Sequence, residues 1–329
     1  MPSSQSPPPN LKYLHLDDLP SDRKNLVASL PSHLVFPGIY LHQYQGFWHI
    51  TRQLMGVLSC QDHFQALDTD ILLVSTPKSG VTWLKSLAFA ILKRDAFPDL
   101  ERHPLLTSNP HTLVPFMEYE HIESDSPDLG RFGFPRLLST HLPVVSLPKT
   151  VVNSSCKIVY LCRNPSDVFI SLWHFANKLL PSGIDEISLE QALMDFTKGI
   201  SLHGPFWDHV LGYWKKSRED PTRVLFLTFE ELIKDPGETV KLLADFFGCP
   251  FRPEEVAGGL VDDIVKLCSF EHLRNLDVNR LGNLPTGESN SAFFRRGEVG
   301  DASNFLTSEQ VNLIDQITEE KFGGSQLKL

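Results

Sequence analysis

The sequence contains no long hydrophobic run. Its apolar stretches, such as Ile71–Val74 and Leu87–Leu92, fall far short of the roughly 18 consecutive apolar residues that a membrane-spanning helix needs. The N-terminus lacks the basic and then apolar regions of a secretory signal, and Pro2 excludes N-myristoylation. We therefore expect a cytoplasmic protein that does not act at a membrane.

Cysteine and basic charge are also limited. The chain has five scattered cysteines and no Cys-x-x-Cys pair, which predicts reduced thiols without a disulfide framework or a zinc site. It has 30 lysines and arginines against 40 aspartates and glutamates, for a net charge of −10. Because nucleic acids and anionic membranes both bind basic surfaces, neither is an expected partner.

What the sequence does contain is a repeated pattern of an apolar run, a tight turn and a helical segment. The runs are Ile71–Ser75, Lys157–Cys162 and Val224–Thr228. Strands separated by helices imply crossover connections and a parallel sheet. In a chain that is 41% hydrophobic, we predict one α/β domain over residues 21–329, with a central parallel β-sheet flanked by helices and a flexible tail over 1–20.

The turn after the first run has the features of a P-loop-like anion-binding loop. In Thr76-Pro77-Lys78-Ser79-Gly80-Val81-Thr82-Trp83 a strand leads to a helix N-terminus, whose free N–H groups favour an anion. An ordinary turn with a surface lysine remains an alternative. A P-loop kinase is disfavoured, because Lys78 precedes the glycine and the other strand ends carry Arg163 and Phe229 where a magnesium ligand would be acidic.

Other candidate residues follow further strands and one loop. Arg163 follows the second run and Ser171 lies in the helix after it, where both side chains suit a phosphate. The alternative is a helix cap, with Asn164 as the cap beside a surface arginine. We expect Asn279–Ala292 to be a mobile loop that brings the following segment Arg295-Arg296-Gly297 to an anion. The alternative is a solvated basic pair, which is the commonest state of two adjacent arginines.

A histidine also occupies a strand end. His141 follows the predicted strand Arg136–Ser139 and precedes Leu142-Pro143. Histidine is the usual proton acceptor near neutral pH, so His141 is a candidate general base. With thirteen histidines in the chain, a bystander role is the alternative.

Together these motifs resemble the cytosolic sulfotransferases, and His141-Leu142-Pro143 and Gly204-Pro205-Phe206-Trp207-Asp208-His209 are similar to the plant soluble branch. The resemblance extends from about residue 39 to the C-terminus. It implies a sulfotransferase that moves a sulfuryl group from 3′-phosphoadenosine 5′-phosphosulfate (PAPS) to a hydroxyl of a small-molecule acceptor, without a metal. By the same resemblance His141 is the base and Lys78 stabilises the leaving phosphate.

The resemblance also implies which residues bind PAPS. Trp83 and Phe270 would face the adenine, Ser171 could also hold Lys78 until an acceptor arrives, and the remaining residues would contact the two phosphate ends. The full set is Lys78, Ser79, Gly80, Val81, Thr82, Trp83, Arg163, Ser171, Phe229, Cys268, Ser269, Phe270, Arg295, Arg296 and Gly297.

Three positions depart from the family pattern. The family usually has threonine at Val81, tyrosine at Phe229 and tryptophan at Ala302. The first two departures each remove a hydroxyl that would bond to the cofactor, so we predict an active enzyme with weakened PAPS binding. A PAPS-binding or PAP-binding pseudoenzyme is the alternative that these departures support.

The resemblance also bears on the acceptor pocket and on the oligomeric state. By family analogy, apolar residues near Tyr40–Trp48, Met117–Tyr119 and Phe175 would line the acceptor pocket, which suits a phenolic, flavonoid, steroid or hormone-like alcohol. Of the family's dimerisation signature, which would fall at Ser303–Asn312, only Thr307 is present. We therefore expect a monomer.

Overall fold

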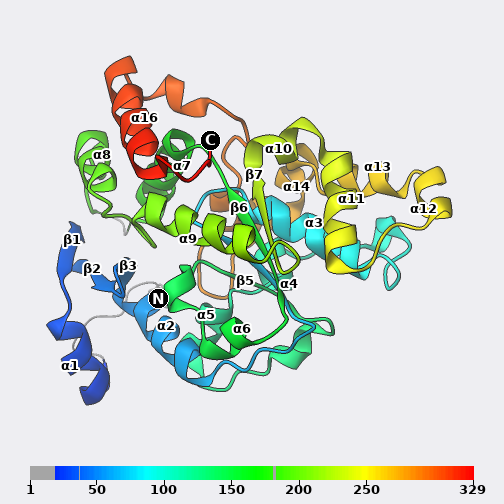
Figure 1. The fold of residues 1–329 in the computed structure, drawn as a ribbon, viewed down its shortest axis with the longest axis horizontal. Coiled ribbons are helices and arrows are strands. Elements are labelled where there is room, and N and C mark those ends of the chain that lie inside the picture. Colours follow the sequence, from blue (N-terminus) through cyan, green and yellow to red (C-terminus); the bar gives the residue numbers. More distant parts are fainter. Residues whose placement is uncertain (1–18, 37, 181–182) are drawn as a thin grey trace, which may run out of the picture.

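A four-stranded parallel sheet forms the centre of the molecule (Figure 1). The structure, a computed structural model, describes residues 19–36, 38–180 and 183–329. The strands run in the order β5-β4-β6-β7, with bounds β4 (Ile71–Ser75), β5 (Leu137–Thr140), β6 (Lys157–Cys162) and β7 (Val224–Thr228). The predicted parallel sheet is confirmed. Three strands have the predicted bounds, and β5 begins and ends one residue later than expected.

Helices cover both faces of this sheet because successive strand residues point to opposite sides. On β4, Leu72 and Val74 enter one apolar cluster, which also contains residues of the helices over 51–63, 165–178, 189–197, 206–219 and 308–322. Ile71 and Leu73 enter a second cluster, with residues of the helices over 81–93, 229–234, 236–247 and 260–267. Continuous apolar runs are therefore what a strand buried on both faces requires.

The helices have these bounds: α1 (Ser21–Ser29), α2 (Thr51–His63), α3 (Val81–Lys93), α4 (Pro110–Leu113), α5 (Met117–Glu123), α6 (Lys149–Asn153), α7 (Pro165–Lys178), α8 (Leu189–Thr197), α9 (Phe206–Glu219), α10 (Phe229–Lys234), α11 (Pro236–Phe247), α12 (Pro253–Ala257), α13 (Leu260–Leu267), α14 (Phe270–Asn275), α15 (Asp277–Leu281) and α16 (Ser308–Phe322). Short 3₁₀ turns are η2 (Leu100–Arg102), η3 (Pro104–Leu106), η4 (Leu129–Phe132), η5 (Val144–Ser146), η6 (Asn290–Phe293) and η7 (Asp301–Asn304). None of the described helices is long and apolar enough to cross a membrane.

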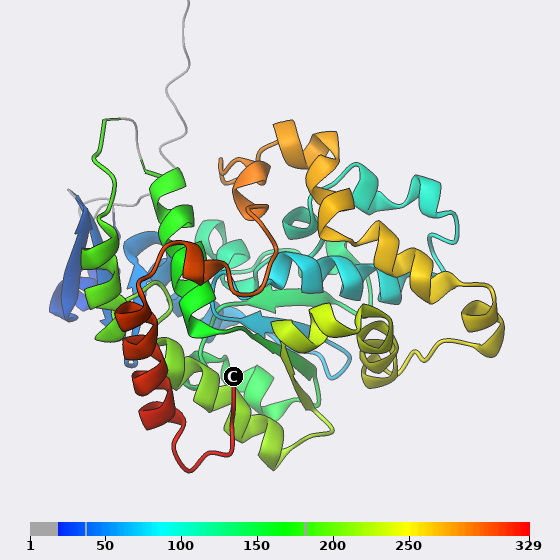
Figure 2. The same ribbon diagram turned by 90° about the horizontal axis from the view of Figure 1, so that it is seen from above.

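A small antiparallel sheet lies at the N-terminal end of the described chain. Its strands β1 (Ser32–Phe36), β2 (Ile39–Tyr44) and β3 (Phe47–Ile50) pair in sequence order. Together with α1 they form one end of the molecule, and α11, α12 and α13 lie at the other (Figures 1 and 2). The flexible tail predicted for residues 1–20 falls mostly outside the described residues, although Leu19 is buried in a third apolar cluster.

The segment expected to be a mobile loop, Asn279–Ala292, is tied to the protein. The buried Asn279 bonds to Asn109 at 2.8 Å, and the Asn290 amide donates to the carbonyl of Val278. Between α15 and η6 the segment is a loop, as expected, and its mobility stays a prediction. Its two buried asparagines supply bonds that a Gly-, Asn- and Ser-rich composition does not reveal. From η6 the chain continues between α3 and α7 to η7 (Figure 2). As predicted, all five cysteines are free thiols.

Candidate active site

The loop between β4 and α3 turns through two left-handed residues. Lys78 has φ +71° and Gly80 has φ +104°. A Cβ atom on Gly80 would lie 2.6 Å from the ring of Phe229, so this position requires glycine. The turn places the first N–H groups of α3 at the carboxyl end of the sheet, where they and the helix dipole favour an anion.

The other loop side chains are largely turned into the protein. The buried Ser79 hydroxyl bonds to the Thr76 hydroxyl at 2.7 Å, and Val81 is buried. The Thr82 hydroxyl lies 2.9 Å from Nε2 of His111. Trp83 packs edge-on against Phe229, with ring centroids 6.0 Å apart. The loop therefore presents its backbone and Lys78 more than its small side chains.

Lys78 has an aromatic rather than an acidic environment. Its Nζ lies 4.2 Å from the ring centroid of Phe175 and 5.8 Å from that of Phe293. Burial, together with the charges of Arg295 and Arg163, lowers the pKa of Lys78 to about 7. The described chain shows no hydrogen bond between Lys78 and the buried Ser171, so in this state the rings, not Ser171, contact the ammonium. An anion nearby would favour the charged lysine.

Arg163, at the end of β6, is 5% exposed and therefore not a surface arginine. It donates to Asp167 at 3.2 Å and to the Glu298 carbonyl at 2.5 Å. Its guanidinium also lies 4.6 Å from the Phe229 ring centroid. The predicted cap is present too, since the Asn164 side chain accepts from two N–H groups at the start of α7. The cap is therefore confirmed and the surface position of the arginine is wrong, while the phosphate contact of Arg163 stays a prediction.

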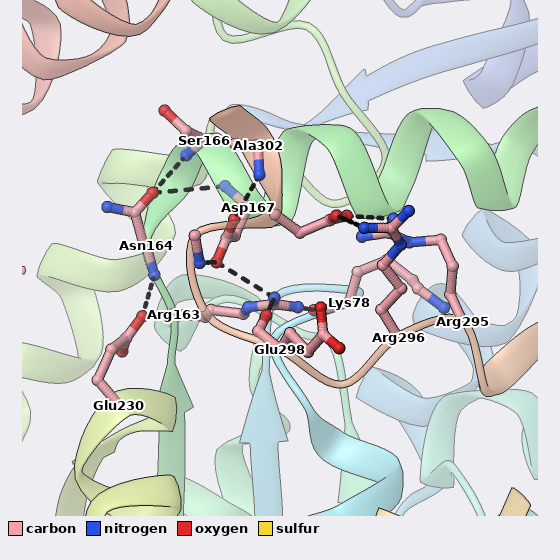
Figure 3. Close-up of polar contacts among 12 residues, drawn as sticks. Lys78, Arg163, Asn164, Ser166, Asp167, Glu230, Arg295, Arg296, Glu298 and Ala302 are labelled. Atoms are coloured by element: carbon pink, nitrogen blue, oxygen red, sulfur yellow. Dashed lines mark hydrogen bonds and ion pairs between the residues drawn. The ribbon is translucent and has the colours of Figure 1, made fainter. Parts of the chain in front are cut away.

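The buried carboxylate of Asp167 joins α7 to the loop after the basic segment (Figure 3). One oxygen accepts from the Gly300 N–H at 2.8 Å and the other from the Ala302 N–H at 3.0 Å. The same carboxylate pairs with Arg163. Ala302 is thus held by its backbone N–H.

Arg295 and Arg296 share a partner, Asp301. Both guanidinium groups form ion pairs with this fully buried carboxylate, Arg296 at 2.8 Å. Gly297 approaches Phe270 so closely that a Cβ atom would lie 2.6 Å from its ring. The pair is thus held by a carboxylate and only partly solvated, with the Arg295 side chain 23% and the Arg296 side chain 46% exposed. Figure 3 places both arginines beside Lys78 and Arg163.

Of the three predicted binding residues in Cys268-Ser269-Phe270, at the start of α14, only the last faces the basic segment. Cys268 is fully buried in the apolar core, and burial raises the pKa of its thiol. The Ser269 hydroxyl caps α14 by accepting from the His272 N–H. The thiol and the hydroxyl therefore serve packing and capping, while Phe270 faces the basic segment through Gly297.

His141 is held in one tautomer. Its Nδ1 lies 2.7 Å from the Ser75 carbonyl, which only accepts, so Nδ1 carries the proton and Nε2 has the free electron pair. Burial lowers the pKa of His141 to about 3, which keeps the ring neutral near pH 7. The backbone N–H of His141 donates to Glu118, whose own pKa is raised to about 7 by burial. The neutral His141 ring, with a free electron pair on Nε2, is in the protonation state that a general base needs.

Several donors in this region are buried without a protein partner. They are Nε of Arg163, Nε of Arg295 and the indole N–H of Trp83. Because buried donors are normally paired, a group absent from the chain is expected to accept from them, and an anion with an aromatic ring fits all three. The described residues contain no cluster of three or more histidine, cysteine or acidic side chains that could hold a metal ion.

The sequence analysis did not identify five buried polar residues of this region, which are Lys85, His111, Glu118, Asp167 and Asp301. The acidic ones have no signal of their own in a chain with 40 acidic residues. Lys85 did have one, because it interrupts the apolar face of α3, where a charge is unusual.

Comparisons with known proteins agree with this geometry. A family model described as "Sulfotransferase domain" matches residues 68–326. Cytosolic sulfotransferase 12 of Arabidopsis thaliana is 47% identical over 330 residues, covering 100% of this chain and 99% of that protein. The crystal structure of an Arabidopsis thaliana protein named as a candidate steroid sulphotransferase is 43% identical, with TM-score 0.76, covering 96% of this chain and 98% of that one. A mouse sulfotransferase solved with PAP is 29% identical, with TM-score 0.64, covering 87% and 95%.

The role of Asp167 predicts a specific change in local stability. Asp167→Asn removes the charge that holds Arg163 and weakens the bonds to two loop amides. We expect amide hydrogen exchange of residues 298–302 to rise by at least about tenfold, since a bond to a charged group is worth roughly 1.5–3 kcal/mol. Hydrogen-exchange mass spectrometry measures this. Glu230→Gln is the control, because Glu230 accepts from Asn164 on the other side of the turn. Equal exchange in both variants would contradict the role of Asp167.

Proposed function

The chain belongs to the sulfotransferase family, and we propose that it transfers a sulfuryl group from PAPS to a hydroxyl of a small aromatic or steroid-like acceptor in the cytosol. The observation that carries the proposal is that three buried N–H groups near the loop of Lys78 have no protein acceptor: Nε of Arg163, Nε of Arg295 and the indole N–H of Trp83. The mouse relative solved with PAP and the cytosolic plant relatives support the donor and the compartment.

The two ends of the donor would contact two groups of cations. The N–H groups of the loop over 78–83 and Lys78 would bind the 5′-phosphosulfate, and Arg163, Ser171 and Arg295-Arg296-Gly297 would bind the 3′-phosphate. Trp83 and Phe270 would contact the adenine. The proximity of Gly297 to Phe270 and of Gly80 to Phe229 supports this division, since each contact joins two of the assigned segments.

An aromatic enclosure around the reacting groups suits a flat acceptor. The ring of Phe116 lies 4.5 Å from that of His141, and Phe175 and Phe293 lie over Lys78. Aromatic walls favour stacked or edge-on ring contacts. This enclosure supports phenolic, flavonoid or steroid-like alcohols.

In the proposed reaction Nε2 of His141 takes the proton of the acceptor hydroxyl as the acceptor oxygen forms its bond to sulfur. The bond between sulfur and the bridging phosphate oxygen breaks, and Lys78 stabilises the negative charge that appears there. The carbonyl of Ser75 accepts from Nδ1, so it holds the ring in place and stabilises the imidazolium that forms. PAP and a sulfate ester are the products.

The proposed reaction predicts a sulfotransferase activity that depends on His141. With labelled PAPS and a panel of phenols, flavonols, steroids and hydroxylated hormones, we expect sulfated product from the wild type, and at least about 100-fold less from His141→Ala. His103→Ala is the control, because His103 is also buried but packs against Phe89 and Phe97. Binding of PAP without turnover would identify a pseudoenzyme instead, and turnover with ATP and magnesium would identify a kinase.

The lowered pKa of Lys78 predicts proton uptake on binding. In the ligand-free chain this pKa is about 7, and a neighbouring phosphate raises it. Above pH 7 a neutral lysine must therefore take up a proton, so PAP affinity should fall as the pH rises, by up to about tenfold per pH unit. Calorimetry at pH 8 in buffers of different ionisation enthalpy measures the uptake. The Lys78→Met variant should show a smaller uptake, and an uptake equal to that of the wild type would refute the assignment.

The departures at Val81 and Phe229 predict gains of affinity. Both side chains are buried, so a hydroxyl placed there gains most when the donor accepts its hydrogen bond. Val81→Thr and Phe229→Tyr should each tighten PAP binding by about two- to tenfold. Titration calorimetry measures this, with Val152→Thr on the exposed surface as a control. Unchanged affinity in both variants would show that these positions do not contact the donor.

A further inference from the structure

A second lysine on α3 lies directly behind the anion-binding loop. Lys85 follows Thr82 by three residues, so the two share one face of the helix. Its side chain is fully buried, its Nζ lies 3.0 Å from Nδ1 of His111, and the ammonium is 3.5 Å from the ring centroid of Phe116. A charge buried so completely requires a partner, and His111 is the hydrogen-bonded one.

His111 connects this lysine to the loop. Its other nitrogen, Nε2, lies 2.9 Å from the Thr82 hydroxyl oxygen. The ring is fixed on both sides, because it stacks on Phe116 and lies 4.3 Å from the ring of Phe293. At its backbone, the N–H of His111 donates to Asn109, which is itself bonded to Asn279. Lys85, His111 and Thr82 therefore form one continuous hydrogen-bonded chain.

The chemistry of the three groups gives this chain a direction. An ammonium only donates, so Nδ1 of His111 accepts from Lys85 and the remaining ring proton lies on Nε2. That proton is donated to the Thr82 oxygen. Thr82 then has its own hydroxyl proton free to donate towards the loop. Each bond thus determines the next, and the last donor, the Thr82 hydroxyl, lies in the first turn of α3, beside the N–H groups where an anion is expected.

Two opposing effects act on the charge of Lys85. Burial lowers its pKa well below the ordinary value, whereas the Glu118 carboxylate and the face of Phe116 both favour the ammonium. An anion bound at the loop adds a further favourable charge within the same buried region. Binding therefore stabilises the protonation state that orients the chain.

We propose that Lys85 and His111 are positioning residues for the sulfuryl donor: they orient the Thr82 hydroxyl as a hydrogen-bond donor to the 5′ phosphate end. This inference rests on the proposed function, because it needs an anion at the loop. Without Lys85, His111 can carry its proton on Nδ1 and accept from Thr82 through Nε2. The hydroxyl would then present an oxygen lone pair to the anion, which is repulsive.

A double-mutant cycle with PAP as the probe tests the proposal. We expect Lys85→Met and Thr82→Val each to weaken PAP binding by roughly tenfold, as the loss of a bond to a charged group would. If Lys85 acts through Thr82, adding Lys85→Met to Thr82→Val should cost less than about twofold more. Titration calorimetry measures the four affinities. Multiplicative losses in the double variant would overturn the proposal.

A matched control separates this effect from general destabilisation. Lys157 is likewise a lysine that bonds within the protein and lies over a ring. It donates to the backbone carbonyl of Phe246 and lies over the ring of the same residue, at the end of β6 that is remote from the site. Lys157→Met should lower the melting temperature and leave PAP affinity unchanged. If Lys85→Met fails to fold, Lys85→Met/His111→Phe removes both buried partners together and leaves only the Thr82 hydroxyl, which is half-buried. The same cycle with Thr82→Val then applies.

The tautomer of His111 gives an independent readout. In ¹⁵N-labelled protein with PAP bound, long-range correlations should show Nε2 protonated and Nδ1 as the acceptor, and Lys85→Met should change this pattern. A protonated Nδ1 in the wild type would overturn the proposal. If the wild type does not bind PAP at all, the proposed function fails, whereas binding without coupling between Lys85 and Thr82 rejects only this inference.

Discussion

The site depends on the buried ion pair between Arg163 and Asp167. Arg163 ends a strand and Asp167 lies in the first turn of the following helix, so the pair spans a single turn of the chain. Through the second contacts of both residues it also holds the loop over 298–302, which is more than 130 residues away in sequence. One short-range interaction thus determines where a distant basic segment lies. Without it, the arginines at 295 and 296 would have no fixed place beside Lys78.

The positive site in an acidic protein is assembled from compensated charges. Arg163 is balanced by Asp167, and Arg295 and Arg296 are balanced by Asp301. Two buried carboxylates thus accompany three guanidinium groups, of which the first is buried, the second half-buried and the third exposed. Lys78 differs, because it lies over rings and its pKa falls to about 7. Buried cations are costly unless they are paired or neutralised, and this region uses both solutions. The net charge of −10 therefore describes the surface and not the site.

The sequence predicted the parallel sheet and the positions of the main cations well, because both have local signals. A strand buried on two faces is a continuous apolar run, and a strand-to-helix turn with glycine and lysine is recognisable alone. The antiparallel strands β1 to β3 were not predicted, since they are short, and buried and exposed residues do not alternate regularly along them. The contacts of Asp167, Asp301 and Glu118 were not predictable either, because the groups that these carboxylates bind come together only in the folded chain.

The shared carboxylate of Asp301 has a consequence for selectivity. Any anion that binds to Arg295 or Arg296 competes with a fully buried carboxylate already in contact with both. Chloride or another monovalent ion offers no more charge than that carboxylate and fewer acceptor atoms, so it has little advantage. A doubly charged phosphate with three acceptor oxygens can engage both forks while the carboxylate stays in place. In the proposed site, Asp301 would therefore favour a doubly charged phosphate over a monovalent anion at these two arginines.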